Sequence, residues 1–189
     1  MVDWEQRVEE EWGRAFVHES GHALMATLQG IPCHGVYFQR SEKGGKFCTL
    51  IPPKPADERT KKDYLFLAAG CAAEDLIYKG HDEEAAGGDR KDFDLPDSPL
   101  FDGALEDASK LLFEKRRHLK RLVSMLKTKV RQVDYDLDRL PEVGMDSSDQ
   151  RYLRLLGKEE LEAAVRRPQT RDTRAAHRGG TRATLEREA

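Results

Sequence analysis

The sequence predicts a mainly α-helical fold with one small β-hairpin. Apolar residues recur at three- and four-residue steps in the N-terminal segment and again from residue 57 onward, which is the periodicity of amphipathic helices. Between these segments, two short runs of β-branched and aromatic residues flank a glycine-containing turn, as in a hairpin. With 189 residues, 38% of them hydrophobic, the chain is long enough for one domain with a real core.

The expected elements of the first half follow in order. One long helix, or two stacked ones, is expected over 3–30, because Gly30 and the nearby Pro32 give a stop signal. The hairpin strands are "GVYFQR" and "KFCTLI", separated by "SEKGG". A second helix, unusually apolar and rich in small residues, is expected over 57–79 and is closed by Gly80. We expect this helix to be buried against the first.

The second half begins with an acidic loop, "HDEEAAGGDRKDFDLPDSP", that prolines interrupt. A long amphipathic helix follows, with an apolar stripe from Ala108 to Val130, and "YLRLLGKEELEAAV" predicts a last short helical segment. The C-terminal residues are basic and nearly without apolar side chains, so they cannot bury enough surface to offset the entropy of ordering. We therefore expect a domain over 1–165 and a basic, disordered tail over 166–189.

Charge and cysteine content argue against several classes of protein. The formal net charge is -3, and the strongly basic segment 110–131 carries no nucleic-acid motif, so it is expected to be a solvated helix face. The cysteines, Cys33, Cys48 and Cys71, predict neither a disulfide framework nor a cysteine zinc site. No apolar run approaches the roughly 20 residues of a membrane span, and the N-terminus is unlike a signal peptide. We expect a cytoplasmic protein for which neither a membrane nor nucleic acid is a partner.

One stretch, "FVHESGHALMA", carries the strongest indication of chemistry. His18 and His22 are four residues apart, so on a helix they share a face and can direct both imidazoles at one metal ion. Glu19 is turned by about 100 degrees from His18, which lets it reach a water on that ion but places it poorly for binding the ion. The spacing therefore predicts two ligands and one general base.

The alternative is a helix whose two histidines are satisfied by ordinary hydrogen bonds. The metal interpretation is favoured because the helix is well indicated, Gly21 leaves room beside the pair, and the acidic loop can fold back to supply a third ligand. Glu74, in the apolar helix, is a second candidate ligand, or else it orients one imidazole as a hydrogen-bond acceptor. His34 and His81 lie in expected loops and are more simply explained as solvated.

At this point the chain resembles the peptidase domain of the FtsH-type ATP-dependent zinc metallopeptidases. "FVHESGHALMA" is similar to that family's zinc-binding helix, "AAGCAAEDLIYKG" to its Gly-Gly-x-Ala-Ala-Glu-Glu helix, and "GGDRKDF" to the segment whose aspartate is the third zinc ligand. The resemblance covers residues 14–93 well and the later helices more loosely. It implies an FtsH-peptidase-like zincin fold in which His18, His22 and Asp92 bind Zn²⁺ and Glu19 is the base.

The chain also departs from that family. It begins just before the zinc helix, without room for an ATPase domain or membrane anchor, and Pro96 and Pro99 interrupt the segment after the ligand aspartate. Asp89 and Asp94 are therefore alternatives to Asp92. We expect a zinc metalloendopeptidase without its own motor, acting on unfolded or flexible polypeptides. The alternative is a catalytically idle zinc-binding module for protein interaction or regulation, and a partner ATPase or a homo-oligomer stays open.

Overall fold

Helices dominate the part of the chain that the computed structural model describes, which is residues 12–41, 44–81, 89, 99–132 and 151–166. This confirms the mainly helical class. The elements are helices α2 (Gly13–Gln29), α3 (Lys61–Tyr78), α5 (Pro99–Glu114), α6 (Arg116–Gln132) and α7 (Lys158–Arg166), the 3-10 helix η1 (Ala56–Glu58), and strands β1 (Gly35–Ser41), β2 (Gly44–Leu50) and β3 (Arg151–Gly157).

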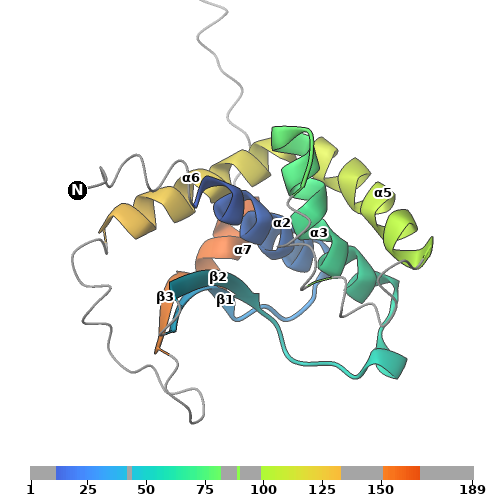
Figure 1. Ribbon diagram of the computed structural model, residues 1–189, viewed down its shortest axis with the longest axis horizontal. Coiled ribbons are helices and arrows are strands. Elements are labelled where there is room, and N and C mark those ends of the chain that lie inside the picture. The colour runs from blue at the N-terminus through green and yellow to red at the C-terminus, as the bar shows by residue number, and fades with distance from the viewer. Residues whose placement is uncertain (1–11, 42–43, 82–88, 90–98, 133–150, 167–189) are drawn as a thin grey trace, which may run out of the picture.

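Helices α2 and α3 lie side by side at the centre of the described structure. Helix α5 packs on α3, helix α6 packs on α2, and the sheet lies on the other side of the central pair (Figure 1). Because α2 has neighbours on several sides, it is buried over nearly its whole length, including the polar residues of its middle turns. A helix surrounded in this way can hold polar side chains away from bulk water.

The predicted hairpin is confirmed, but it is part of a larger sheet. Strands β1 and β2 are antiparallel, and β3 pairs antiparallel with the other edge of β1, so the strand order is β2-β1-β3. The helix predicted from residue 152 onward is wrong over β3, which is a strand, and helix begins only at Lys158. The run "YLRLLG" is short enough to satisfy either periodicity, and the open edge of β1 decides in favour of a strand.

An irregularity in the β1–β3 pairing explains how β3 fills the core. Opposite β1, the register shifts between Val36 and Tyr37, which pair with Leu156 and Arg154, so Leu155 is the extra residue of a bulge. As a result, the neighbouring Leu155 and Leu156 are 4% and 0% exposed, although regular alternation would turn one of them outward. Because of this bulge, the sequence of β3 lacks the alternating pattern of apolar and polar residues from which a strand is predicted.

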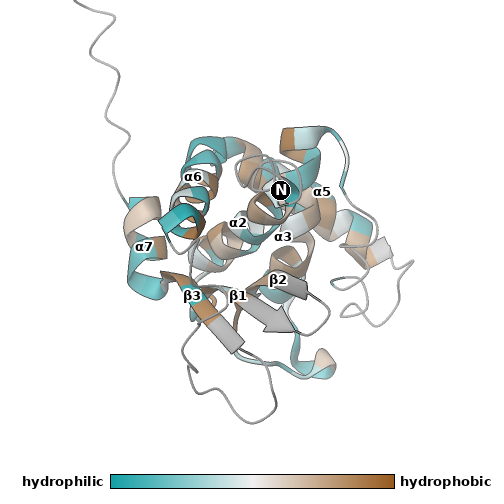
Figure 2. Ribbon diagram, turned by 60° about the vertical axis from the view of Figure 1, so that its left-hand side comes forward, coloured by the Kyte–Doolittle hydropathy of each residue, from teal (hydrophilic) through white to brown (hydrophobic). Residues whose placement is uncertain are grey.

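The predicted long amphipathic helix is in fact two helices. Helix α5 ends at Glu114 and α6 begins at Arg116. The apolar stripe continues through the break, but its partner changes, since α5 packs mainly on α3 and α6 on α2, β3 and α7. The outer turns of α6 are hydrophilic, as Figure 2 shows. The basic side of α6 therefore faces away from the core, as expected for a solvated face.

The ends of the two central helices agree only partly with the sequence analysis. Gly30 caps α2 with φ at 66°, as predicted. Helix α3 begins at Lys61 rather than residue 57, because the backbone N–H of Thr60 donates to Asp63 Oδ2 at 2.6 Å in a capping box. It ends with Lys79 at φ 61°, one residue before the predicted Gly80. The expected helical residues 3–11, most of the acidic loop and the tail beyond 166 lie outside the described residues.

Candidate metal centre

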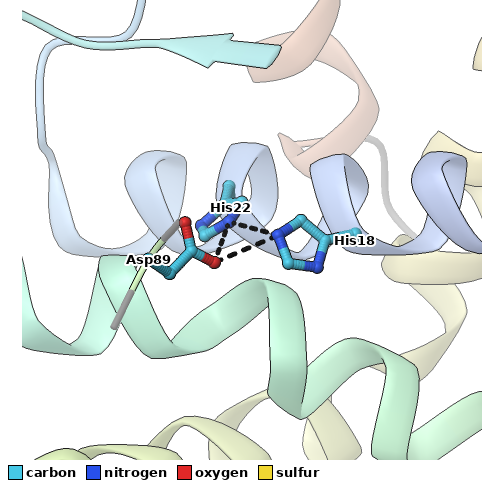
Figure 3. Close-up of side chains that lie close together, drawn as sticks. All are labelled: His18, His22 and Asp89. Carbon is cyan, nitrogen blue, oxygen red and sulfur yellow. Dashed lines mark hydrogen bonds and ion pairs between the residues drawn. The ribbon is translucent and has the colours of Figure 1, made fainter. Parts of the chain in front are cut away.

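Helix α2 brings two imidazole rings to one point. His18 and His22 are 8% and 4% exposed, and their ring centroids are 4.8 Å apart. Their Nε2 atoms are 3.1 Å apart, so both rings present the same nitrogen to a shared space (Figure 3). The predicted common face of the two histidines is therefore present.

The opposite nitrogen of each ring is held by an acceptor on α3. His18 Nδ1 lies 2.7 Å from Glu74 Oε1, and His22 Nδ1 lies 2.7 Å from the backbone oxygen of Phe66. A carbonyl oxygen and a carboxylate oxygen accept hydrogen bonds, so each Nδ1 carries the proton and donates. In the neutral rings, both Nε2 atoms are then unprotonated and carry a free lone pair, and this is the form of imidazole that binds a metal ion.

A carboxylate completes the group. Asp89 Oδ2 lies 3.0 Å from His18 Nε2 and 3.2 Å from His22 Nε2, and its side chain is 20% exposed (Figure 3). With the two rings neutral, all three atoms are acceptors, and three acceptors in van der Waals contact repel one another unless a cation lies among them. That cation is either a proton on an imidazole or a metal ion. No other group of three such side chains occurs in the described ranges.

The geometry of the three atoms fits a metal ion. At zinc-like bond lengths, tetrahedral ligand atoms lie about 3.3 Å apart, and neighbouring ligands of a six-coordinate ion lie about 3.0 Å apart. The separations here are 3.0, 3.1 and 3.2 Å. Two imidazoles and one carboxylate occupy one face of either arrangement, and no further carboxylate, imidazole or thiolate of the described residues joins them. Zinc and several other first-row metals accept this donor set.

Space for the imidazoles comes from Gly70 on α3. A Cβ atom placed on Gly70 would lie 2.4 Å from His18 Nε2 and 2.6 Å from His22 Nε2. Both contacts are far inside the normal van der Waals range, and both involve rings that hydrogen bonds already fix. Glycine in a helix interior costs roughly 1 kcal/mol relative to alanine, so its presence here has a physical reason.

Gly21 on α2 lets the two helices approach each other. A Cβ atom there would lie 2.3 Å from the backbone oxygen of Ala69 and 2.7 Å from the Cβ of Ala73. From the sequence, this glycine was predicted to leave room beside the histidines. The room that it leaves is taken by the backbone of α3, and this close approach is what brings the acceptors on α3 within reach of both rings.

Glu19 is a buried carboxylate beside the triad. Its residue is 8% exposed, and Thr49 Oγ1 on β2 lies 2.8 Å from its Oε2 atom. Among the described residues, no lysine or arginine forms an ion pair with Glu19. The hydrogen bond from Thr49 offsets part of the cost of burying this carboxylate, and His18 and His22 are close enough to interact with it electrostatically.

Glu74 has the second of the two roles that the sequence left open. It is 1% exposed, and it bridges His18 and Arg14, whose Nη1 atom lies 3.2 Å from Glu74 Oε2. Arg14 also donates to the backbone oxygen of Gly80 at 3.0 Å, and its guanidinium lies over the Tyr78 ring. A carboxylate held in this way fixes the orientation of the imidazole and is not itself in the triad.

The two imidazoles and the carboxylate of the triad shift one another's pKa values. Burial disfavours a charged imidazole, but hydrogen bonds to Asp89 and Glu74 outweigh it and raise the pKa of His18 to about 10. Burial opposes charge on His22 as well, and the attraction of Asp89 still raises its pKa. Burial also works against ionised Asp89, but His22 and His18 together hold its pKa well below the ordinary value. At neutral pH the raised pKa of His18 favours its protonated form, with which a metal ion would compete.

The residue assignments made from the sequence divide into three groups. His18, His22, Glu19 and Glu74 are brought together by α2 and α3. Asp89, named as an alternative, is the carboxylate at the histidines, whereas the first choice, Asp92, and the other alternative, Asp94, lie outside the described residues. His34 and His81 do not join the triad; His34 is exposed, and His81 pairs with Asp75 at 2.9 Å.

Three features of the site were missed in the sequence. Gly70 and Phe66 lie on the face of α3 that includes Glu74, at the helical spacing of four, so the glycine inside an apolar helix was the available indication. The backbone carbonyl of Phe66 could not be predicted as an acceptor from the sequence, because every residue has a backbone carbonyl. Thr49 depends on the placement of β2 over α2, which local patterns do not encode.

Comparisons with known proteins add no family assignment. Neither a scan against protein-family models nor a search of curated proteins found a match to this chain. Within the ranges that the structure describes, no helix has both the length and the apolar character needed to cross a membrane.

Proposed function

We propose that the protein is a zinc-dependent metalloendopeptidase related to the FtsH-type peptidase domains. The observation that carries the proposal is the convergence of His18 Nε2, His22 Nε2 and Asp89 Oδ2, three acceptor atoms within 3.2 Å of one another. The relation to the FtsH type rests on the sequence motifs. Glu19, which directly follows the first histidine, favours hydrolysis over other uses of a two-histidine, one-carboxylate site.

The division of roles follows from what each side chain contacts. A bound zinc ion supplies a Lewis acid that polarises the substrate carbonyl and acidifies water. His18 and His22 are fixed by acceptors on α3, so they hold their lone pairs in place without rearranging. Glu19 accepts the proton of the attacking water and delivers it to the leaving amine. Because Oε2 of Glu19 accepts a hydrogen bond from Thr49, we assign this transfer to Oε1.

The burial of the site points to the kind of substrate. The two histidines and Glu19 are at most 8% exposed, so a peptide bond must come close to the core to reach them. A segment of a folded protein would have to break its own backbone hydrogen bonds to enter so deeply, whereas an extended chain would not. We therefore infer that the substrates are unfolded or flexible polypeptides.

The decisive experiment compares wild-type protein with Glu19→Gln on an unfolded substrate such as casein. The variant keeps the shape of the side chain and the three metal-binding residues, so its zinc content should match that of wild type. Cleavage should fall by at least about 100-fold, because the general base is lost. Glu106→Gln, which changes an exposed glutamate on α5 that pairs with Lys110, is the matched control and should cleave normally.

Metal analysis separates this proposal from its alternatives. One zinc ion per chain without cleavage of any unfolded substrate would support a catalytically idle zinc-binding module, and purified protein containing iron would support a different chemistry. Protein that takes up no metal at all would contradict both zinc proposals. Asp89→Ala should lose the metal ion, while Asp92→Ala and Asp94→Ala test the carboxylates outside the described residues. Loss of metal from the Asp92 variant alone would assign the third ligand to Asp92.

A further inference from the structure

One contact joins the sheet to the candidate base. Thr49 Oγ1 lies 2.8 Å from Glu19 Oε2 and 3.1 Å from the backbone oxygen of Glu19. A threonine hydroxyl has one proton, and the shorter contact is to the oxygen that carries negative charge, so the carboxylate is the better acceptor. No lysine or arginine in the described ranges forms an ion pair with Glu19, so this hydroxyl is the hydrogen-bond donor that holds its Oε2 atom.

The packing of β2 on α2 determines where Thr49 lies. Phe47 and Thr49 are two residues apart on β2 and therefore share the face that looks towards α2. Phe47 packs edge-on against Phe16 with ring centroids 4.9 Å apart, and it also contacts Trp12 and Phe38. Phe16 and Glu19 are three residues apart and share one face of α2. The aromatic contact therefore sets the strand so that its next inward residue reaches Glu19.

We propose that Thr49 is a positioning residue for Glu19. The Thr49 hydroxyl holds one oxygen of the Glu19 carboxylate so that the other oxygen faces the candidate metal site. This inference rests on the proposed function, since the orientation of Glu19 matters for turnover only if Glu19 is the base. It goes beyond that function in assigning the sheet a part in the reaction. A strand that shifted along α2 would leave the base in place but turn its carboxylate away.

The test compares two substitutions at the same position. Thr49→Val keeps the branched shape and removes the hydroxyl, whereas Thr49→Ser keeps the hydroxyl and removes a methyl group. Because a hydrogen bond to a charged group is lost, Thr49→Val should lower kcat about tenfold to a hundredfold. It should leave KM within about threefold and the zinc content unchanged, and Thr49→Ser should restore most of kcat.

A matched control removes the same chemical group elsewhere on the molecule. Thr27 Oγ1 donates to the backbone oxygen of Ala23 at 2.9 Å on α2, and no contact joins it to the triad. Thr27→Val should leave kcat unchanged. In the Glu19→Gln background, Thr49→Val should cause no further loss of activity, because the group that it positions is already disabled.

A second measurement does not depend on activity. Thr49→Val should lower the midpoint of thermal unfolding, and this decrease should be much smaller in a Glu19→Ala background, where the carboxylate is absent. If wild type cleaves nothing, the proposed function fails, and this cycle still decides whether Thr49 holds Glu19. The proposal is overturned if Thr49→Val has wild-type kcat, if serine fails to restore it, if the variant loses zinc, or if the unfolding effects simply add.

Discussion

Helix α2 has two very different interfaces. Towards α3 it presents small and polar residues, with Gly21 against the backbone of Ala69 and with His18 and His22 against Gly70. Towards α6 it meets a stripe of large aliphatic side chains that are fully or nearly fully buried: Leu119, Leu122, Leu126 and Val130. The first interface brings backbones close together and fixes polar atoms, and the second buries apolar surface.

One helix can therefore contribute both to stability, on the side of α6, and to the candidate metal site, on the side of α3. Small residues bury little apolar area, so the α2–α3 interface gains less from the hydrophobic effect than its closeness suggests. The buried polar groups of that interface also need every hydrogen bond that they make. The aliphatic stripe on α6 offsets these costs on the opposite side of α2. Substitutions on the two sides should therefore have separable effects.

The largest effect is expected for Gly70→Ala. The added methyl group would overlap both imidazoles, which cannot move because Glu74 and Phe66 hold them. Zinc binding, measured by competition with a chromogenic chelator, should fall by more than about a hundredfold. Gly103→Ala on α5 is the control, since a Cβ atom there would meet no atom of the described residues within 4 Å. The free energy of unfolding of that variant should rise by about 0.5–1 kcal/mol. Its zinc affinity should be unchanged. Normal zinc binding by Gly70→Ala would contradict the role assigned to this glycine.

The next effect concerns the other interface. Leu126→Ala removes a fully buried side chain from the stripe on α6 and should lower the free energy of unfolding by about 2–5 kcal/mol in denaturant titrations. The folded variant should still bind one zinc ion with wild-type affinity. A loss of zinc affinity in fully folded protein would show that the two interfaces are coupled.

A smaller effect is expected for Glu74→Gln. The amide can still accept a hydrogen bond from His18, but the negative charge between His18 and Arg14 is lost. Zinc affinity should fall about tenfold to a hundredfold, as is typical when a partner of a ligand histidine is changed. Glu162→Gln, at a glutamate of α7 that pairs with Arg166, should leave the affinity unchanged. Equal losses in both variants would indicate a general charge effect.

The pH dependence of zinc binding tests the charges of the site. The pKa of His18 is raised to about 10 without metal, so between pH 6 and pH 8 this imidazole carries a proton that zinc must displace. Asp89, with its lowered pKa, is ionised throughout this range and contributes no slope. Zinc affinity should therefore rise with pH by about tenfold per unit for each proton displaced. Calorimetry in buffers with different ionisation enthalpies should report proton release, and binding independent of pH would contradict the assignment.

The smallest effect is expected on the outer side of α6. Lys120 is exposed on the basic face, and Lys120→Gln should change the free energy of unfolding by less than about 0.5 kcal/mol. No association with nucleic acid is expected at low salt, either for this variant or for wild type. Binding that weakens steeply as salt is added would instead assign a polyanion partner to this face.

The sequence predicted those parts of the molecule that depend on local spacing. The pairing of His18 with His22, the end of α2 at Gly30 and the β1–β2 hairpin all follow from neighbouring residues, and the structure confirms them. Strand β3 was missed because its identity is decided by the open edge of β1, far away in the chain.

The proposed third ligand shows the same limit within the candidate site. The sequence placed it in the acidic loop, which contains several aspartates within a few residues. The order among Asp89, Asp92 and Asp94 depends on how that loop returns to α2, and no periodic pattern records this. Thr49 was missed for a related reason, since it meets Glu19 only through the packing of a strand on a helix.

The two histidines differ in how easily a mutation can remove the hydrogen-bond acceptor that orients each ring. His18 is oriented by the side chain of Glu74, which a single codon change removes. His22 is oriented by the backbone oxygen of Phe66, which every amino acid at position 66 would supply as long as α3 keeps its path. A single substitution can therefore remove the group that orients His18, whereas the group that orients His22 is kept as long as the backbone fold is kept.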